Sequence, residues 1–225
     1  MAINEAKYQE IKDELREGIC LVAVSKTKPA DDIMALYELG QRDFGENYVQ
    51  ELVDKQSQLP GDIHWHFIGH LQSNKVKYIA PFVHLVHGVD SPKLLAEINK
   101  QAIKNGRVID VLLQIHIATE ETKFGMDEYE LMALIDDIVQ APDKYAGVRI
   151  RGLMGMASFS DNLEQVRNEF RLLKRLYDAV RSRALNTAQI QPDTLSMGMS
   201  GDYRIAIDEG SNMVRIGSLL FGARG

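Results

Sequence analysis

Cysteine is nearly absent from this sequence, with Cys20 the only one among 225 residues. A disulfide within the chain is therefore excluded, which suits a reducing compartment. Because Cys20 lies in an apolar run, we expect it to be a small buried hydrophobe. No stretch reaches the roughly 20 apolar residues that span a bilayer, and residues 1–15 lack the apolar core of a signal peptide. We expect a cytoplasmic protein that does not enter a membrane.

Two further absences narrow the class of ligand. Lys and Arg total 26 against 32 Asp and Glu, a net charge of −6. This balance argues against a nucleic-acid surface, which needs clustered cations. Neither GxxxxGKS/T nor GxGxxG occurs, so the sequence supports neither a nucleotide P-loop nor a dinucleotide-binding turn.

The rest of the chain alternates between apolar runs of strand length and stretches with helical periodicity. The runs are apolar without alternation, which suits strands buried on both faces of a parallel sheet. Eight such runs separated by helices favour an α/β fold, a (β/α)8 TIM barrel with an extra N-terminal helix over 3–15, as a single domain spanning 1–225. The expected strands are 19–24, 43–44, 65–68, 83–86, 108–117, 148–154, 194–197 and 213–216. The expected helices are 31–39, 46–58, 71–80, 91–104, 127–139 and 161–185.

A lysine stands where the first strand ends, in "VAVSKTKP" (22–29). In TIM barrels the chemistry lies at the carboxyl ends of the strands, so Lys26 is expected to point at the mouth of the site. Pro29 favours an extended or turn geometry for the residue before it. We therefore expect Lys28 on the rim, and Lys26 is the candidate reactive amine.

The last two strands end in glycine–serine turns, "LSMGMSGD" (195–202) and "MVRIGSLLFG" (213–222). Barrels frequently bind phosphate with these two loops. Ser200 is a natural N-cap for a helix over 201–209, with backbone N–H groups beside its hydroxyl. Gly217 allows the backbone to approach a ligand closely, and Ser218 adds a hydroxyl and an N–H. The turns predict a phosphate site; the alternative is that both serines only cap helices.

An arginine interrupts the apolar last strand, two residues before this turn. Arg215 needs a partner because an unpaired buried charge is costly; that partner is either a structural carboxylate or a ligand. A reactive lysine, a phosphate site and an arginine between them together suit pyridoxal 5'-phosphate, whose aldehyde condenses with an amine. Strands one and eight adjoin in a closed barrel, so Lys26 and Arg215 are expected to reach one ring.

Six segments, in order along almost the whole chain, resemble the YggS/PROSC family of pyridoxal phosphate homeostasis proteins. The resemblance implies a barrel of the alanine racemase fold type (fold type III without its β domain), with pyridoxal 5'-phosphate held as a Schiff base on Lys26. It also implies a role in intracellular cofactor homeostasis that influences amino- and keto-acid metabolism. The implied contacts are Ser200, Gly217 and Ser218 to the phosphate, Arg215 to the pyridine nitrogen and Asn47 near the ring. The segments are "VAVSKTKP", "FGENYVQE" (44–51), "WHFIGHLQSNK" (65–75), "RGLMGM" (151–156), "LSMGMSGD" and "MVRIGSLLFGAR" (213–224).

Carriage of the cofactor is favoured over catalysis, and no catalytic residue is assigned. An arginine beside the ring nitrogen makes the ring a poorer electron sink, although racemases of this fold type work with such an arginine, so it does not exclude catalysis. Racemases of this fold type have a second domain that supplies an acid–base tyrosine, for which the chain leaves no room after strand eight. The alternatives are an amino-acid racemase and a phosphate-binding barrel enzyme in which Lys26 stabilises charge without a Schiff base. Expected partners are the cofactor, amino acids and cofactor-requiring apo-enzymes, and a monomer is favoured over a dimer.

Histidines raise the question of a metal site. Alternation places His64 and His66 on one face of strand three, and His84 and His87 follow. No Cys, Asp or Glu completes a recognisable ligand set in the sequence, so no metal is expected. We expect His66 to face the site mouth and contact the ring or water, and His70 has no assigned role.

Overall fold

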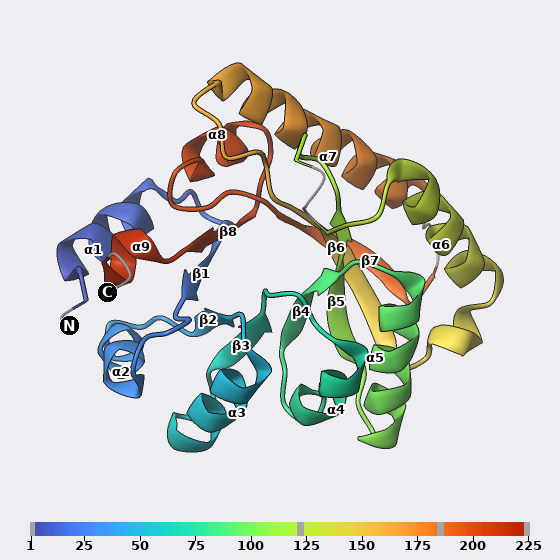
Figure 1. Ribbon diagram of the computed structural model, residues 1–225, viewed down its shortest axis with the longest axis horizontal. Helices are drawn as coiled ribbons and strands as arrows, with labels where there is room; N and C mark the ends of the chain where they lie inside the picture. The colour runs from blue at the N-terminus through green and yellow to red at the C-terminus, as the bar shows by residue number, and fades with distance from the viewer. Residues whose placement is uncertain (1–2, 121–123, 184–186, 223–225) are drawn as a thin grey trace.

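In a computed structural model, which describes residues 3–120, 124–183 and 187–222, eight parallel strands close into a barrel in chain order (Figure 1). The predicted (β/α)8 barrel is confirmed. The strands are β1 (Cys20–Val24), β2 (Asp43–Glu46), β3 (His64–Phe67), β4 (Leu85–Val89), β5 (Ile109–Ile115), β6 (Val148–Gly155), β7 (Ile190–Ser196) and β8 (Met213–Ile216).

Helices surround the barrel, and the extra N-terminal helix α1 packs beside the last helix α9, as Figure 1 shows. The Asn4 N–H donates to the Leu220 carbonyl at 2.8 Å, so the two ends of the described chain meet. Among the described residues, none of the helices combines the length and apolar character that crossing a membrane requires. The helices are α1 (Glu5–Glu14), α2 (Ala30–Glu38), α3 (Val49–Gln58), η1 (Ser73–Lys75), α4 (Val76–Ile79), α5 (Pro92–Lys104), α6 (Glu128–Gln140), η2 (Pro142–Tyr145), α7 (Leu163–Arg183), α8 (Tyr203–Asp208) and α9 (Ser218–Phe221).

Three of the six helices predicted between strands differ from those observed by more than one residue at an end. The helix expected over 71–80 is a 3-10 turn followed by the single turn of α4. The helix expected from residue 46 begins at Val49, because Glu46 ends β2. The predicted helix 161–185 is α7, whose first residue Leu163 is exposed although its periodicity placed it on the buried face. Residues 184–185 of that prediction lie outside the described residues.

Apolar packing has two parts. The larger lies between the barrel and its helices, and the smaller fills the barrel interior with five side chains. Cys20 is partly rather than fully buried and packs against this interior cluster, where burial raises the pKa of its thiol to about 12. The interior cluster consists of Val22, Leu85, Leu112, Met154 and Met213.

Closure of the barrel places its first strand beside its last. In the register of β1 and β8, Val22 lies opposite Arg215. Lys26 follows β1 by two residues, so the predicted proximity of the first and last strands is confirmed by the topology. The carboxyl ends of both strands open on the same face of the barrel.

Candidate functional site

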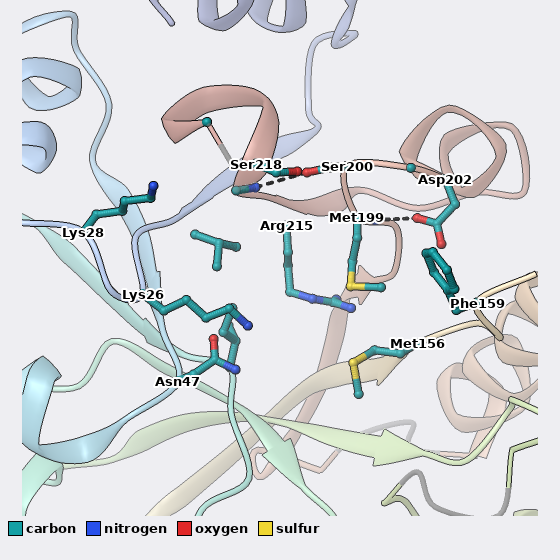
Figure 2. A pocket seen from close by; sticks show the side chains of 15 residues that line it. Lys26, Lys28, Asn47, Met156, Phe159, Met199, Ser200, Asp202, Arg215 and Ser218 are labelled. Atoms are coloured by element: carbon teal, nitrogen blue, oxygen red, sulfur yellow. Dashed lines mark hydrogen bonds between the residues drawn. The ribbon is translucent and has the colours of Figure 1, made fainter. Parts of the chain in front are cut away.

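A pocket of about 460 Å³ lies at the carboxyl ends of the strands, within the size range of small-molecule sites. Figure 2 shows Lys26 extending into it from the left of the view and Arg215 from above. Apolar side chains of Met156 and Met199 also line it. The structure brings all six residues that the sequence singled out to this one pocket: Lys26, Asn47, Ser200, Arg215, Gly217 and Ser218.

The turn that carries Lys26 packs on a buried ion pair between Lys55 and Glu46. Ser25 is buried and donates to Glu46 Oε1 at 2.6 Å, and Lys55 Nζ lies 2.7 Å from the same oxygen. Lys55 also donates to the Ser25 carbonyl at 2.8 Å. Burial raises the pKa of the Glu46 carboxyl, against the opposing charge of Lys55. These contacts fix the backbone on one side of Lys26.

The other side of the turn is fixed at Thr27, whose φ of 63° lies in the left-handed region. A non-glycine residue adopts this conformation only where the surroundings hold it. Here the Thr27 N–H donates to Glu51 Oε1 at 2.6 Å, and Lys55 binds that same oxygen at 2.6 Å. Glu46, Glu51 and Lys55 thus fix the backbone on both sides of Lys26.

Lys28 is not on the rim, and the sequence prediction for it is wrong. Its side chain is 8% exposed, lines the pocket and donates to the Phe221 carbonyl at 2.9 Å. The left-handed turn at Thr27 and the neighbouring α9 bring it inward. The ammonium of Lys28 therefore has a structural acceptor at the end of α9.

Two loops meet at the far end of the pocket, where Ser200 and Ser218 lie side by side (Figure 2). The Gly217 N–H donates to the Ser200 hydroxyl at 3.3 Å. The sequence predicted that Ser200 caps the following helix, and this prediction is wrong. The helix α8 begins only at Tyr203, and its N-cap position is occupied by Asp202. Within the described ranges, the backbone N–H groups of Ser200, Gly201 and Ser218 donate to no protein acceptor. This end of the pocket therefore presents free donors.

Arg215 is buried, with 4% of its surface exposed. It donates to Ser196 Oγ at 2.6 Å and to the Gly155 carbonyl at 3.1 Å. No carboxylate in the described parts of the chain forms an ion pair with it, so the structural salt bridge considered as one alternative is absent there. Burial lowers the pKa of its guanidinium to about 10, against the attraction of Asp202. The pocket thus holds a buried cation that has no carboxylate ion-pair partner among the described residues.

Asn47 lies beside Lys26 in Figure 2, and its Oδ1 is buried without a hydrogen-bond partner among the described residues. Gly69 explains its fixed position, because a Cβ on Gly69 would lie 2.4 Å from the Asn47 carbonyl oxygen. Only glycine permits this close approach of the two loops. An unsatisfied buried acceptor beside an amine is a feature that a ligand would complete.

His66 does not face the site mouth, and this prediction is wrong. It is 1% exposed and lies inside the barrel, where Nδ1 is 2.9 Å from His87 Nε2 and Nε2 is 3.0 Å from Asp43 Oδ1. His87 Nδ1 in turn lies 3.3 Å from the Ser196 hydroxyl that Arg215 binds. We call this chain of contacts the axial row; its members are Arg215, Ser196, His87, His66 and Asp43.

Asp43 also corrects the prediction that no acidic residue completes a ligand set with the histidines. Its Oδ1 lies 3.2 Å from His64 Nδ1 as well as 3.0 Å from His66 Nε2. His70 lies elsewhere: it contacts Asp90 at 3.1 Å and stacks on Phe124.

Comparisons with known proteins show the family to which the chain belongs. The family model of the alanine racemase N-terminal domain matches residues 4–225. The pyridoxal phosphate homeostasis protein of Aquifex aeolicus is 43% identical over 205 residues, covering 91% of this chain and 86% of that protein. The human protein of the same name is 42% identical over 237 residues, covering 99% and 84%. This chain belongs to the pyridoxal phosphate homeostasis protein family.

Solved structures agree with membership of this family. PipY of Synechococcus elongatus with PLP bound has a TM-score of 0.85 at 32% identity, covering 96% of this chain and 99% of that one. Alanine racemase of Clostridium difficile has a TM-score of 0.74 at 17% identity and shows the shared fold alone. The chain covers 56% of that racemase.

The residues that sequence reasoning missed are those beneath the pocket. Glu46 and Lys55 were not singled out in the sequence. Glu46 ends a buried strand, so its carboxylate needs a partner in the same way as the guanidinium of Arg215. The argument that a buried charge needs a partner would have found Glu46. Nothing local points to Ser196 or His87, which meet across 109 positions of the sequence.

Proposed function

We propose that this chain binds pyridoxal 5'-phosphate in the pocket between Lys26 and Arg215 and serves cellular homeostasis of that cofactor, as the names of its relatives describe for them. The observation that carries the proposal is Arg215, a buried cation without a carboxylate partner among the described residues. A ligand with a ring nitrogen or an anionic group would complement this charge, for which the Ser196 hydroxyl and the Gly155 carbonyl are only neutral acceptors.

The remaining residues fit the same ligand. Lys26 supplies an amine for covalent attachment of an aldehyde, and Asn47 Oδ1 offers an unused acceptor beside it. The free N–H groups of Ser200, Gly201 and Ser218 and the two serine hydroxyls suit a phosphate. When bound, the cofactor supplies an electrophilic carbonyl carbon and an electron-accepting ring. Arg215 would disfavour protonation of a ring nitrogen placed beside it, because the guanidinium presents a positive charge there.

Homeostasis of the cofactor, rather than racemisation, is the role that the names of the relatives support. The pocket residues would bind the phosphate, the aldehyde and the ring nitrogen, and Arg215 would weaken the electron-accepting power that carbanion chemistry needs. The likeness to alanine racemase, at 17% identity, supports the fold and no activity. Location in the cytoplasm, a monomeric state and the lack of nucleic-acid binding stay predictions.

Covalent trapping tests the attachment. The chain is incubated with pyridoxal 5'-phosphate, reduced with borohydride and digested, and the modified peptide is identified by mass. We expect the adduct on Lys26, its loss in Lys26→Met, and its retention in Lys28→Met, which removes the neighbouring pocket ammonium. An adduct confined to other lysines, or none, overturns the proposal.

Transfer tests the homeostatic role. Loaded protein is mixed with an apo-enzyme that requires the cofactor, and activation is followed in time. We expect activation faster than release of the cofactor into a trap that captures it from solution. If activation is no faster than release into the trap, the chain binds the cofactor but does not deliver it directly to the apo-enzyme.

A further inference from the structure

We propose that Asp43, His66 and His84 bind a divalent transition metal ion such as Zn²⁺ at the amino-terminal end of the barrel, the end opposite Lys26. One ligand atom from each of the three residues lies within 4.8 Å of the others. Asp43 and His64 begin β2 and β3, and His84 immediately precedes β4, so adjacent strands bring the side chains together. We call Asp43, His64, His66 and His84 the histidine cluster.

The donor set is suited to zinc. Two imidazoles and a carboxylate are a common set of three protein ligands for Zn²⁺, with a further position left for water or another ligand. His64 is placed to approach that further position, because its Nδ1 lies 3.2 Å from Asp43 Oδ1 and its ring stacks on His84 with centroids 4.5 Å apart. Imidazole nitrogens favour Zn²⁺, Cu²⁺ or Ni²⁺ over Mg²⁺ and Ca²⁺, which prefer oxygen ligands.

Access from solvent also suits a metal. His64 and His84 are exposed, while His66 is buried, so an ion can enter from solvent and reach an ordered ligand.

The buried ligand has the outer support that zinc histidines usually have. The second nitrogen of His66, Nδ1, lies 2.9 Å from His87 Nε2, and this contact holds the orientation of the ring. A metal on His66 Nε2 requires the hydrogen of that ring on Nδ1, from where it donates to His87. The carboxylate of Asp43 then ligates the metal instead of accepting a hydrogen bond from His66.

A hydrogen-bonded cluster with no metal affinity is the competing explanation, and titration separates the two. Zn²⁺ is titrated into the tag-free full-length chain at pH 7.5, without pyridoxal 5'-phosphate, against a chromogenic zinc chelator. We expect one Zn²⁺ per chain at micromolar or lower concentration, and no competition from a hundredfold excess of Mg²⁺. Binding of much less than one equivalent overturns the proposal.

Variants locate the ion. His84→Ala removes an exposed side chain, and we expect it to weaken Zn²⁺ binding 10- to 100-fold, with the far-ultraviolet circular dichroism unchanged. Asp43→Asn should weaken binding by a similar factor. His70→Ala is the matched control, since His70 is an exposed histidine outside the histidine cluster, and it should bind Zn²⁺ as the parent does. Equal affinity of His84→Ala and the parent assigns the ion to another place and overturns the proposal.

Discussion

Lys55 and Glu46 form an ion pair of 2.7 Å in which the two side chains are 8% and 0% exposed. The pair lies at the base of the turn that carries Lys26, and Ser25 joins it through its hydroxyl and its carbonyl. The position of the candidate reactive amine therefore depends on two charges that never reach the pocket.

Removal of one partner of this ion pair should lower the free energy of unfolding more than removal of both partners. Lys55→Met leaves the buried Glu46 carboxylate uncompensated, so we expect the free energy of unfolding to fall by about 3–5 kcal/mol. Lys55→Met combined with Glu46→Leu should recover most of that loss. Urea denaturation followed by the fluorescence of Trp65, the single tryptophan, measures both variants. A double variant no more stable than Lys55→Met would contradict this account.

Arg215 should matter more for the ligand than for the fold. Arg215→Met relieves the burial of a charge and loses two hydrogen bonds, so we expect stability without ligand to change by less than about 1.5 kcal/mol. Affinity for pyridoxal 5'-phosphate should fall at least tenfold, as measured by titration of the absorbance of the bound cofactor. Arg175→Met, at an exposed arginine paired with Glu128, is the control and should leave affinity unchanged. Unchanged affinity in Arg215→Met would remove Arg215 from the ligand site.

Ser200 should distinguish the phosphorylated from the unphosphorylated cofactor. Ser200→Ala removes a hydroxyl and the acceptor of the Gly217 N–H, and hydrogen bonds to a charged group contribute about 1.5–3 kcal/mol. We expect roughly tenfold or greater loss of affinity for pyridoxal 5'-phosphate and no change for pyridoxal. Ser182→Ala, on the exposed face of α7, serves as control. An equal loss for both ligands would place Ser200 away from the phosphate.

The contact between α1 and α8 should depend on pH. Glu14 accepts hydrogen bonds from the Arg204 guanidinium and from the Tyr203 hydroxyl, which lower the pKa of its carboxyl to about 2. Because the folded pKa is below the unfolded one, this contribution to stability is present above about pH 4.5 and is lost as the pH falls towards 2.

Glu14→Gln measures that contribution. At pH 7 we expect the variant to be less stable than the parent by under about 1 kcal/mol, since the pair is partly exposed. The difference should shrink as the pH falls below 4.5 and be absent near pH 2. Urea denaturation at pH 7, 4, 3 and 2 provides the comparison. A difference that is the same at every pH would show that the ionisation of Glu14 is not its cause.

The barrel was predictable because most of its buried strands are encoded by a continuous run of apolar residues in the sequence. The second strand was the least clear: it was expected over 43–44 and extends over Asp43–Glu46. Gly45 and Glu46 are poor strand formers by themselves, and Glu46 is accommodated by Lys55, nine positions away. The prediction of one helix over 71–80 was wrong although its apolar periodicity is clear. Periodicity alone cannot show that Ser73–Lys75 forms a 3-10 turn.

The pocket was predictable to the extent that barrel geometry places strand ends together. Lys26, Ser200 and Arg215 follow from that rule and from the resemblance to a known family. The inward position of Lys28 depends on the left-handed backbone of Thr27, and the place of His66 depends on Asp43, 23 positions away. Contacts made across such distances leave no pattern within a short window of sequence.

The axial row has a consequence for the molecule as a whole. The carboxylate of Asp43 can only accept, so with both imidazoles neutral His66 donates from Nε2 to Asp43, His87 donates from Nε2 to His66, and His87 Nδ1 accepts from the Ser196 hydroxyl. A cation bound to His66 Nε2 would reverse this order in both rings, so that His87 Nδ1 donates to the Ser196 oxygen beside the guanidinium. Any effect of that cation on the affinity of a ligand above Arg215 would be matched by an equal effect of the ligand on the affinity for the cation. The axial row is thus a candidate route for heterotropic linkage between the two ends of the barrel.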